Sequence, residues 1–371
     1  MRLALSLARH GYGQTSPNPM VGAVLVRDGE IIGCGWHHRA GLPHAEIEAL
    51  QDARKHGHNP RGATLYVTLE PCCTRGRTPP CTQAIIANGI KRVIAGADDP
   101  NPKHQGRGFE KLRRAGIKVD RWDWRARGAI PACQKMAREC EGLNEAFNHW
   151  IVEGTPFVTV KAAMTLDGKI ATANGESKWI TGEKARARGM KLRHGHDAIL
   201  VGVNTILADN PSLTARNRKK HSRHFRIVLD SLARIPLTAK VVSDGQPAET
   251  IIVVGKSAPK DRVAALAQKV KVVVAPVKAS NLNLSWLLKK LGAENITSLL
   301  VEGGGEVNAS FLLQRLAQRV AFFYAPKILG GRDSHKAVAG EGVRRLDDAL
   351  QLREIEWRRV GPDLFLTARV D

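Results

Sequence analysis

The sequence predicts an α/β protein of two domains, and three observations support this. Its 371 residues exceed the size of one ordinary domain, which is about 100–200 residues. Short apolar runs alternate with segments of helical spacing along the chain, as in layered α/β folds. All six cysteines lie at or before Cys140, so the two halves differ in chemistry. We place the domains at residues 1–148 and 149–371, with the connection near Gly154-Thr155-Pro156.

The first half begins with a short amphipathic helix at Met1–His10, which ends at Gly11. The apolar run Val21–Val26 is followed by Asp28-Gly29, a dipeptide typical of hairpin turns, so a paired strand should come next. Strands and helices then alternate: strands at Ile31–Gly35, Ala63–Leu69, Arg92–Ala97 and Ile117–Val119, helices at Ala45–His56, Thr82–Ala87 and Gly108–Ala115, and a longer helical stretch at about Pro131–Ile151.

The second half contains another alternating set of elements. Its expected strands are mostly continuous apolar runs, as in sheets buried on both faces. They lie at Phe157–Ala162, Ala198–Val203, Arg226–Leu229, Thr250–Val254, Val270–Ala275, Ser298–Val301, Val320–Tyr324 and Leu364–Val370. Helices are expected at Glu183–His194, Asp261–Gln268, Leu284–Leu291 and Glu306–Gln318.

Composition indicates a protein that neither crosses a membrane nor is secreted. No run approaches the ~20 apolar residues that span a bilayer. The N-terminal apolar stretch is short and is interrupted by Arg9 and His10 before any signal-peptide cleavage site. We therefore expect a cytoplasmic protein. Cysteines there are thiols, so a cluster among them indicates a metal or catalytic site rather than disulfides.

The formal net charge of +22 suggests a negatively charged partner. Both halves are basic, since residues 1–150 carry 22 Lys and Arg against 14 Asp and Glu. Nucleic acid is one interpretation, and small phosphorylated ligands are the other. An aromatic content of 5% leaves few platforms on which bases could stack, which favours the small ligands. Arg216–Arg226 is predicted to be an exposed basic loop.

Four residues carry the clearest chemistry: His44 and Glu46 in His-Ala-Glu, Cys72 in Glu-Pro-Cys, and Cys81 in Pro-Pro-Cys. One imidazole and two thiolates leave a fourth tetrahedral position for water, as in catalytic zinc sites. Zinc lowers the pKa of that water toward neutrality, and Glu46 is close enough to His44 to move its protons. His44 and both cysteines are expected at helix starts, where main-chain N–H groups stabilise thiolates.

The spacing departs from the zinc-deaminase signature, H-x-E followed by P-C-x-x-C. Cys81 lies nine residues after Cys72, where the signature has three. Two alternatives remain open from the residues alone. In one, Cys73 replaces Cys72 as the ligand; in the other, the cysteines form a structural site.

The segment Gly76–Cys81, Gly-Arg-Thr-Pro-Pro-Cys, resembles the bifunctional deaminase–reductase family of riboflavin biosynthesis, in which this long gap is expected. Other segments resemble the same family across nearly the whole chain: Pro17–Pro19 with Val21-Gly22, Asp99–Pro102, Gly106–Gly108, Lys161–Lys169, Ser177–Thr181, Val203–Pro211, Val301–Gly304 and Ala325–Lys327. The departures are small, with Cys73-Thr74 where the family often has Ser-His and Met20 after Pro19.

The resemblance implies a cytidine-deaminase-like three-layer domain followed by a dihydrofolate-reductase-like domain. It implies deamination of 2,5-diamino-6-ribosylamino-4(3H)-pyrimidinone 5′-phosphate, then reduction of the ribosyl group of 5-amino-6-(5-phosphoribosylamino)uracil to ribityl. One Zn²⁺ per chain and NADPH are the implied cofactors. The expected partner is the phosphorylated pyrimidine, with neither membrane nor nucleic acid, in a homo-oligomer formed through the reductase domain.

The resemblance also implies roles for individual residues. In the deaminase, Asn18 and Arg77 should bind substrate, and zinc should lie on His44, Cys72 and Cys81 with Glu46 as the catalytic residue. Cofactor contacts are implied at Ala163, Trp179, Thr205, Asp209, Ser231, Gly304, Gly305, Glu306, Val307, Asn308, Ala309 and Ser310. Reductase substrate contacts are implied at Ser177, Arg193, Leu213, Arg216 and Glu302.

The residues themselves give weaker support for the cofactor site. Val301–Gly305 is a strand that enters a Gly-rich turn before a helix, and such a turn lets main-chain N–H groups approach a phosphate. It lacks the G-x-G-x-x-G fingerprint of an ordinary dinucleotide site. Two competing functions remain: a deaminase of tRNA or free nucleosides, and an RNA-binding protein with an inactive zinc fold. The long cysteine gap and the second domain weigh against the former, and the intact metal motif weighs against the latter.

Overall fold

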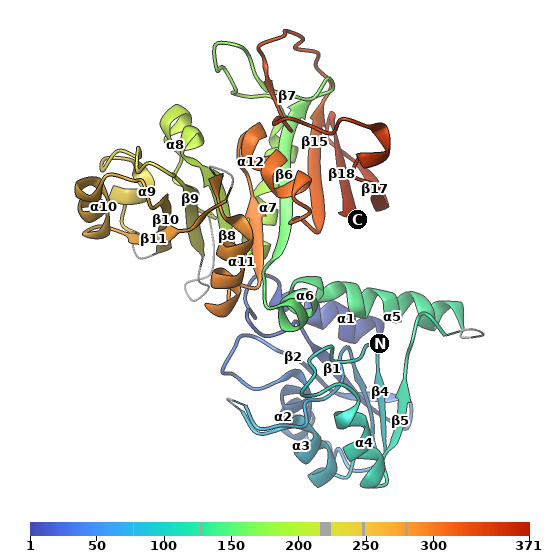
Figure 1. Ribbon diagram of the computed structural model, residues 1–371. Coiled ribbons are helices and arrows are strands. Elements are labelled where there is room, and N and C mark those ends of the chain that lie inside the picture. Colours follow the sequence, from blue (N-terminus) through green and yellow to red (C-terminus); the bar gives the residue numbers. More distant parts are fainter. Residues whose placement is uncertain (77, 127, 129, 216–223, 247–248, 279–280) are drawn as a thin grey trace. The chain divides into compact units, whose positions relative to one another are not determined.

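The chain forms two compact units, Met1–Gly154 and Thr155–Asp371 (Figure 1). The computed structural model describes the whole chain apart from residues 77, 127, 129, 216–223, 247–248 and 279–280. The units divide at the expected Gly154-Thr155 connection, whereas residues 148/149 lie inside helix α6 (Glu145–Glu153). Within the described ranges, every helix is too short or too polar to cross a bilayer.

A five-stranded sheet forms the centre of the first unit, in the order β2-β1-β3-β4-β5. Its strands are β1 (Gly22–Arg27), β2 (Glu30–Trp36), β3 (Thr64–Val67), β4 (Arg92–Ala95) and β5 (Lys118–Arg121). β1 runs antiparallel to β2 and β3, and β3, β4 and β5 are parallel. Asp28 and Gly29 both have positive φ, 53° and 85°, which suits the tight hairpin turn expected for Asp-Gly.

Helices cover both faces of this sheet and make three layers (Figure 1). One layer holds α1 (Arg2–Ala8) and α5 (Pro131–Leu143), and the other holds α2 (Ala45–Lys55), α3 (Cys81–Ala87) and α4 (Arg107–Arg114); a short 3-10 helix, η1 (Arg9–Gly11), follows α1. Helix α2 packs closely on β2 because β2 carries glycines there. A Cβ at Gly33 would lie 2.3 Å from the Ala49 carbonyl oxygen, which leaves no room for a larger residue.

The long helix expected at Pro131–Ile151 is two helices, α5 and α6, which meet at Asn144. The buried Asn144 side chain accepts from the Met20 N–H at 2.7 Å and donates to the Met20 carbonyl at 2.9 Å. This pairing ends α5 and holds the segment that carries Asn18. The continuous-helix prediction is wrong because a long-range hydrogen-bond pair outweighs local helical spacing.

The second unit is built on a nine-stranded sheet in the order β11-β10-β9-β8-β14-β6-β15-β18-β17. The strands are β6 (Phe157–Thr165), β8 (Ala198–Gly202), β9 (Phe225–Leu229), β10 (Thr250–Gly255), β11 (Lys271–Ala275), β14 (Ser298–Val301), β15 (Arg319–Ala325), β17 (Leu352–Val360) and β18 (Asp363–Val370). The strands from β11 to β15 are parallel, and β18 and β17 add an antiparallel edge. Two further pairs are β7 (Lys169–Ala171) with β16 (His335–Lys336), and β12 (Val277–Lys278) with β13 (Asn281–Leu282).

Both faces of the parallel part are buried. Ile251 and Val253 belong to one hydrophobic cluster, and their neighbours Ile252 and Val254 belong to another, because side chains alternate between the faces of a strand. The helices of this unit are α7 (Glu183–Gly195), α8 (Val203–Asp209), α9 (Lys240–Ser243), α10 (Lys260–Ala267), α11 (Leu284–Ala293) and α12 (Gly305–Leu313), with a 3-10 turn η3 (Leu346–Asp348).

The expected basic loop Arg216–Arg226 is described only at its ends, because residues 216–223 lie outside the described part of the chain. The prediction that this loop is exposed is wrong for its last residue, since Arg226 is fully buried on β9. Its guanidinium is paired with Asp244 and donates to three main-chain carbonyls, which compensates for the loss of hydration.

Candidate active sites

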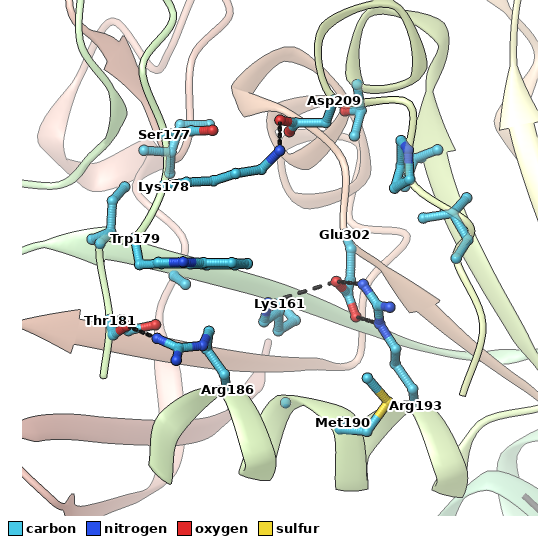
Figure 2. Close-up of a pocket in the computed structure, with 18 of the residues that line it drawn as sticks. Lys161, Ser177, Lys178, Trp179, Thr181, Arg186, Met190, Arg193, Asp209 and Glu302 are labelled. Carbon is cyan, nitrogen blue, oxygen red and sulfur yellow. Dashed lines mark hydrogen bonds and ion pairs between the residues drawn. The ribbon is translucent and has the colours of Figure 1, made fainter. Parts of the chain in front are cut away.

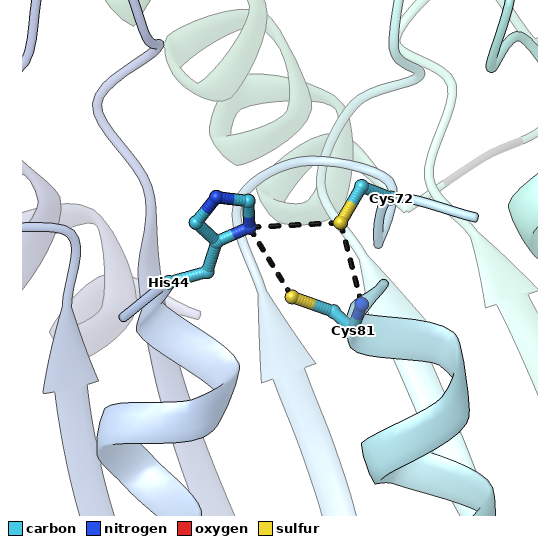
Figure 3. A group of neighbouring side chains, drawn as sticks. All are labelled: His44, Cys72 and Cys81. Atoms are coloured by element: carbon cyan, nitrogen blue, oxygen red, sulfur yellow. Dashed lines mark hydrogen bonds between the residues drawn. The ribbon is translucent and has the colours of Figure 1, made fainter. Parts of the chain in front are cut away.

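The first unit brings His44, Cys72 and Cys81 together (Figure 3). Their ligand atoms, His44 Nδ1 and the two sulfurs, all lie within 4.8 Å of one another. His44 Nδ1 is 3.6 Å from the Cys72 sulfur and 3.3 Å from the Cys81 sulfur. This donor set fits a catalytic zinc ion with three protein ligands and one open position.

Two helix starts position these ligands. His44 is the residue just before α2, and Cys81 is the first residue of α3. Cys72 was expected at a helix start, but it lies in the loop after β3. It is nevertheless served by a helix, because the Cys81 main-chain N–H donates to the Cys72 sulfur at 3.3 Å. The hydrogen bond from the Cys81 thiol lowers the pKa of Cys72 to about 4, which favours its thiolate.

Neighbouring residues contact the His44 imidazole and the sulfur of Cys73, the cysteine next to Cys72. The Thr78 hydroxyl lies 3.3 Å from His44 Nε2, so Nδ1 is the nitrogen left for a metal. The Cys73 sulfur lies 3.7 Å from His104 Nδ1, outside the three-ligand group. The geometry therefore favours Cys72 over Cys73 as the ligand.

Glu46 lines the same pocket as His44 and Cys72, a cavity of about 330 Å³. The residue is only 3% exposed. Burial, reinforced by the charge of nearby Cys72, raises the pKa of Glu46 to about 7. A carboxyl group of this pKa can both accept and release a proton near neutral pH.

Two further residues, Asn18 and Arg77, were expected to bind substrate in this pocket. Asn18 lines it, with its amide nitrogen 3.0 Å from Nε2 of His37, whereas Arg77 lies outside the described residues. The sequence reasoning missed Glu70, which lines the pocket beside the metal ligands. Its carboxylate accepts from the main-chain N–H groups of Asp99, Gly106, Gly108 and Phe109, at 2.9–3.4 Å. Its position two residues before the ligand Cys72, in Glu-Pro-Cys, could have pointed to it.

The second unit contains a larger cavity of about 630 Å³ (Figure 2). It brings together eight residues that the resemblance assigns to cofactor or substrate: Ala163, Ser177, Trp179, Arg193, Thr205, Asp209, Leu213 and Glu302. They come from β6, the segment before α7, α7 itself, α8, the segment after α8 and the residue that follows β14. Residues far apart in sequence therefore meet at one site.

A buried ion-pair network crosses this cavity. Glu302 accepts two hydrogen bonds from Arg193, each 2.9 Å, and lies 3.6 Å from Lys161 Nζ (Figure 2). Burial alone would raise the pKa of Glu302, but the charges of Lys161 and Arg193 outweigh it and lower the pKa to about 2. Lys178 pairs with Asp209 at 2.8 Å on another side of the cavity.

Of the other implied cofactor contacts, residues 304–310 lie in the first two turns of α12, and Ser231 lies just after β9. Residues 304–310 and Ser231 are not among the residues that line the cavity. Space is open beside Gly304, whereas Asn308 is buried and donates to the Ala337 carbonyl at 2.8 Å. Main-chain N–H groups at this helix start suit a phosphate, so the residues present fit a phosphorylated cofactor. Arg216 lies outside the described residues.

Fold and sites together define a two-domain enzyme that joins a zinc deaminase fold to a reductase domain. Residues 1–97 match the family model of the cytidine and deoxycytidylate deaminase zinc-binding region, and residues 156–366 match that of the RibD C-terminal domain. The chain belongs to the RibD family of riboflavin biosynthesis proteins.

Relatives in this family match over nearly their whole length. The riboflavin biosynthesis protein RibD of Aquifex aeolicus is 44% identical over 367 residues, which cover 99% of this chain and 96% of that protein. The solved structure of Acinetobacter baumannii RibD has a TM-score of 0.84 at 32% identity, covering 100% of this chain and 97% of that one. A Thermotoga maritima diaminohydroxyphosphoribosylaminopyrimidine deaminase/5-amino-6-(5-phosphoribosylamino)uracil reductase has a TM-score of 0.80 at 35% identity, with the same coverage.

Proposed function

We propose that this chain catalyses two consecutive steps of riboflavin biosynthesis. The first unit removes the 2-amino group of 2,5-diamino-6-ribosylamino-4(3H)-pyrimidinone 5′-phosphate as ammonia. The second unit reduces the ribosyl group of the resulting 5-amino-6-(5-phosphoribosylamino)uracil to ribityl. The observation that carries the first activity is the three-ligand group of His44, Cys72 and Cys81 with buried Glu46 in one pocket.

In the deaminase pocket, the residues of the chain bind the zinc ion, orient the substrate and transfer protons. Zinc held by the three ligands supplies a water of lowered pKa as the nucleophile. With zinc bound, Glu46 would take one proton of the attacking water to a ring nitrogen and pass the second proton to the amine, so that the carbon–nitrogen bond breaks, ammonia leaves and the water oxygen stays on the ring carbon as a carbonyl. Asn18 orients the ring from the pocket wall. Arg77 is the proposed phosphate ligand, because its guanidinium can bind two phosphate oxygens at once.

In the reductase pocket, NADPH supplies the hydride and the protein supplies binding and orientation. We assign the cofactor to the side of the cavity with Ala163, Trp179, Thr205 and Asp209, and to the start of α12. Substrate then contacts Ser177, Arg193, Leu213 and Glu302, together with Arg216. Glu302 holds the Arg193 guanidinium in place, so the cation is oriented before substrate arrives.

Cys81→Ser should lower the zinc content of the purified protein from about one ion per chain towards zero, because two protein ligands hold zinc far more weakly than three. Cys73→Ser is the matched control and should keep its zinc, since that sulfur contacts His104. Metal analysis by mass spectrometry measures both. A Cys73→Ser protein that loses zinc while Cys81→Ser retains it would show that the ligands are misassigned.

A fragment of residues 155–371 should fold and reduce pre-deaminated substrate with kcat/KM within about threefold of the full chain. Each unit has its own hydrophobic core, and the described residues that line the reductase cavity all belong to the second unit. NADPH oxidation followed by absorbance measures this. A folded but inactive fragment would contradict independent reductase function.

We also propose a homo-oligomer that forms through the second unit, in the cytoplasm. The edge strand β17 supports this, because Ile355 and Trp357 on it are about half exposed, at 50% and 57%. The unpaired edge of a strand can pair with another chain, and these two apolar side chains would be covered there, although the strand also carries charged residues. Light scattering on the 155–371 fragment should give the same number of subunits as for the full chain.

A further inference from the structure

The segment Ser212–Thr214 lines the reductase cavity and is held in an unusual way. Three consecutive main-chain carbonyls each receive a hydrogen bond from a basic side chain. Arg226 donates to the Ser212 oxygen at 3.1 Å, His224 Nε2 lies 3.3 Å from the Leu213 oxygen, and Arg193 donates to the Thr214 oxygen at 3.4 Å. These three contacts in succession fix the main chain of this stretch of cavity wall.

Arg226 is a fully buried cation that the proposed chemistry does not use. Its guanidinium pairs with both carboxylate oxygens of Asp244 and also donates to the carbonyls of Val241 and Gln246. These partners lie in α9 or just after it. The hydrogen bond from Arg226 to Ser212 therefore links the cavity wall to α9. The two terminal nitrogens of the guanidinium make all of these hydrogen bonds, more than the three donors of a lysine ammonium could make.

Leu213 adopts a main-chain conformation that needs such support. Its φ of +51° lies in the left-handed region, which residues with a Cβ rarely adopt unless surrounding contacts determine it. Its side chain is buried in a hydrophobic cluster, and the residue lines the wall of the cavity. The buried His224 holds the carbonyl of this residue.

The same contacts decide which polar groups the wall offers to a ligand. With their carbonyls occupied, Ser212, Leu213 and Thr214 have their N–H groups left, and these donate to no protein acceptor within the described residues. Successive unpaired N–H groups beside a left-handed residue suit an anionic or carbonyl-type acceptor.

We infer that His224 and Arg226 are positioning residues of the reductase site, which set the main chain of residues 212–214 so that its N–H groups bind the phosphorylated pyrimidine. Neither side chain lines the cavity, so each acts through the segment that it holds. This inference rests on the proposed reductase function. It adds two residues that the sequence motifs did not point to, because they lie 11 and 14 positions from their targets and neither belongs to a segment that carries the family resemblance.

The test compares His224→Leu, which loses the donor, with His224→Gln, which keeps an N–H donor at similar reach, in the full-length protein. Calorimetry measures the affinity of the cofactor-free protein for 5-amino-6-(5-phosphoribosylamino)uracil, and steady-state kinetics measure KM for this compound and for NADPH. His224→Leu should weaken pyrimidine binding and raise its KM about tenfold, the effect of one lost hydrogen bond. KM for NADPH and the deaminase activity should stay unchanged, and His224→Gln should lie within about twofold of wild type.

Arg226→Lys provides a second measurement through a different contact, and it should raise KM for the pyrimidine as His224→Leu does. Wild-type affinity for the pyrimidine in His224→Leu would overturn the inference. So would equal losses for pyrimidine and NADPH in both His224 variants together with a lower melting temperature, which would mark a purely structural role. If the wild-type protein binds the pyrimidine but does not oxidise NADPH, the proposed function fails, and the calorimetric comparison still decides the positioning role.

Discussion

Glu46→Gln is expected to reduce ammonia release by at least about 10²–10⁴-fold while the protein keeps its zinc. Glutamine has nearly the same shape as glutamate, so the buried site remains filled, but its amide cannot accept a proton from water or pass one to the leaving amine. The His44, Cys72 and Cys81 ligands are untouched by the substitution. An ammonia assay and metal analysis on the same preparation measure the two quantities.

Glu48→Gln is the matched control, since Glu48 lies on the same helix and does not line the pocket. It should keep wild-type deamination and wild-type zinc content. Reductase activity on pre-deaminated substrate should be unchanged in both variants, because that cavity lies wholly in the second unit. Retained deamination in Glu46→Gln would rule out Glu46 as the residue that moves protons.

The metal site was predictable because its chemistry is encoded in short motifs. His44 and Glu46 are two residues apart, and each cysteine follows a proline. The motifs could not predict which main-chain N–H group donates a hydrogen bond to which sulfur. The Cys81 N–H reaches Cys72 across the loop, a contact that depends on how the intervening residues fold. Glu70 was missed for a related reason, because its four N–H partners lie 29 to 39 residues further along the chain.

The buried parallel strands were also predictable, since continuous apolar runs leave few alternatives. The expected Thr250–Val254 and Ser298–Val301 correspond closely to β10 and β14. Strand β17 was not predicted, because Leu352–Val360 is exposed along most of its length and carries charges on an edge of the sheet. Its hydrogen bonds to β18 stabilise it as a strand, although its own sequence pattern does not predict one. The division of α5 from α6 at Asn144 likewise depends on Met20, far away in sequence.

Glu302→Gln is expected to destabilise the second unit by about 3 kcal/mol and to abolish its reductase activity, because it leaves two largely buried cations without a counter-charge. The Glu302 side chain is 9% exposed, and those of Lys161 and Arg193 are 19% and 21% exposed. Water therefore screens this network only weakly. Hydrogen exchange of the β14 amides in the full chain measures the loss in unfolding free energy.

The pKa of Glu302 gives the expected dependence on pH. Its folded-state pKa is about 2, below the ordinary value of 4.5, so the charged network stabilises the fold fully above about pH 4.5. That contribution, about 3 kcal/mol for this shift, is lost as the pH falls from about 4.5 to 2. Wild-type protein should therefore lose its stability advantage over Glu302→Gln across this interval, and the two should converge at the acid end.

Two comparisons make the Glu302 expectation specific. Glu341→Gln removes an exposed carboxylate from the same unit and should change the stability by less than about 0.5 kcal/mol. Adding Lys161→Met to Glu302→Gln should recover part of the lost stability, since one buried cation fewer then lacks a partner. Deamination should be normal in all three proteins. A Glu302→Gln protein as stable as wild type at neutral pH would mean that the network is hydrated and that Glu302 does not hold Arg193 in place for the substrate.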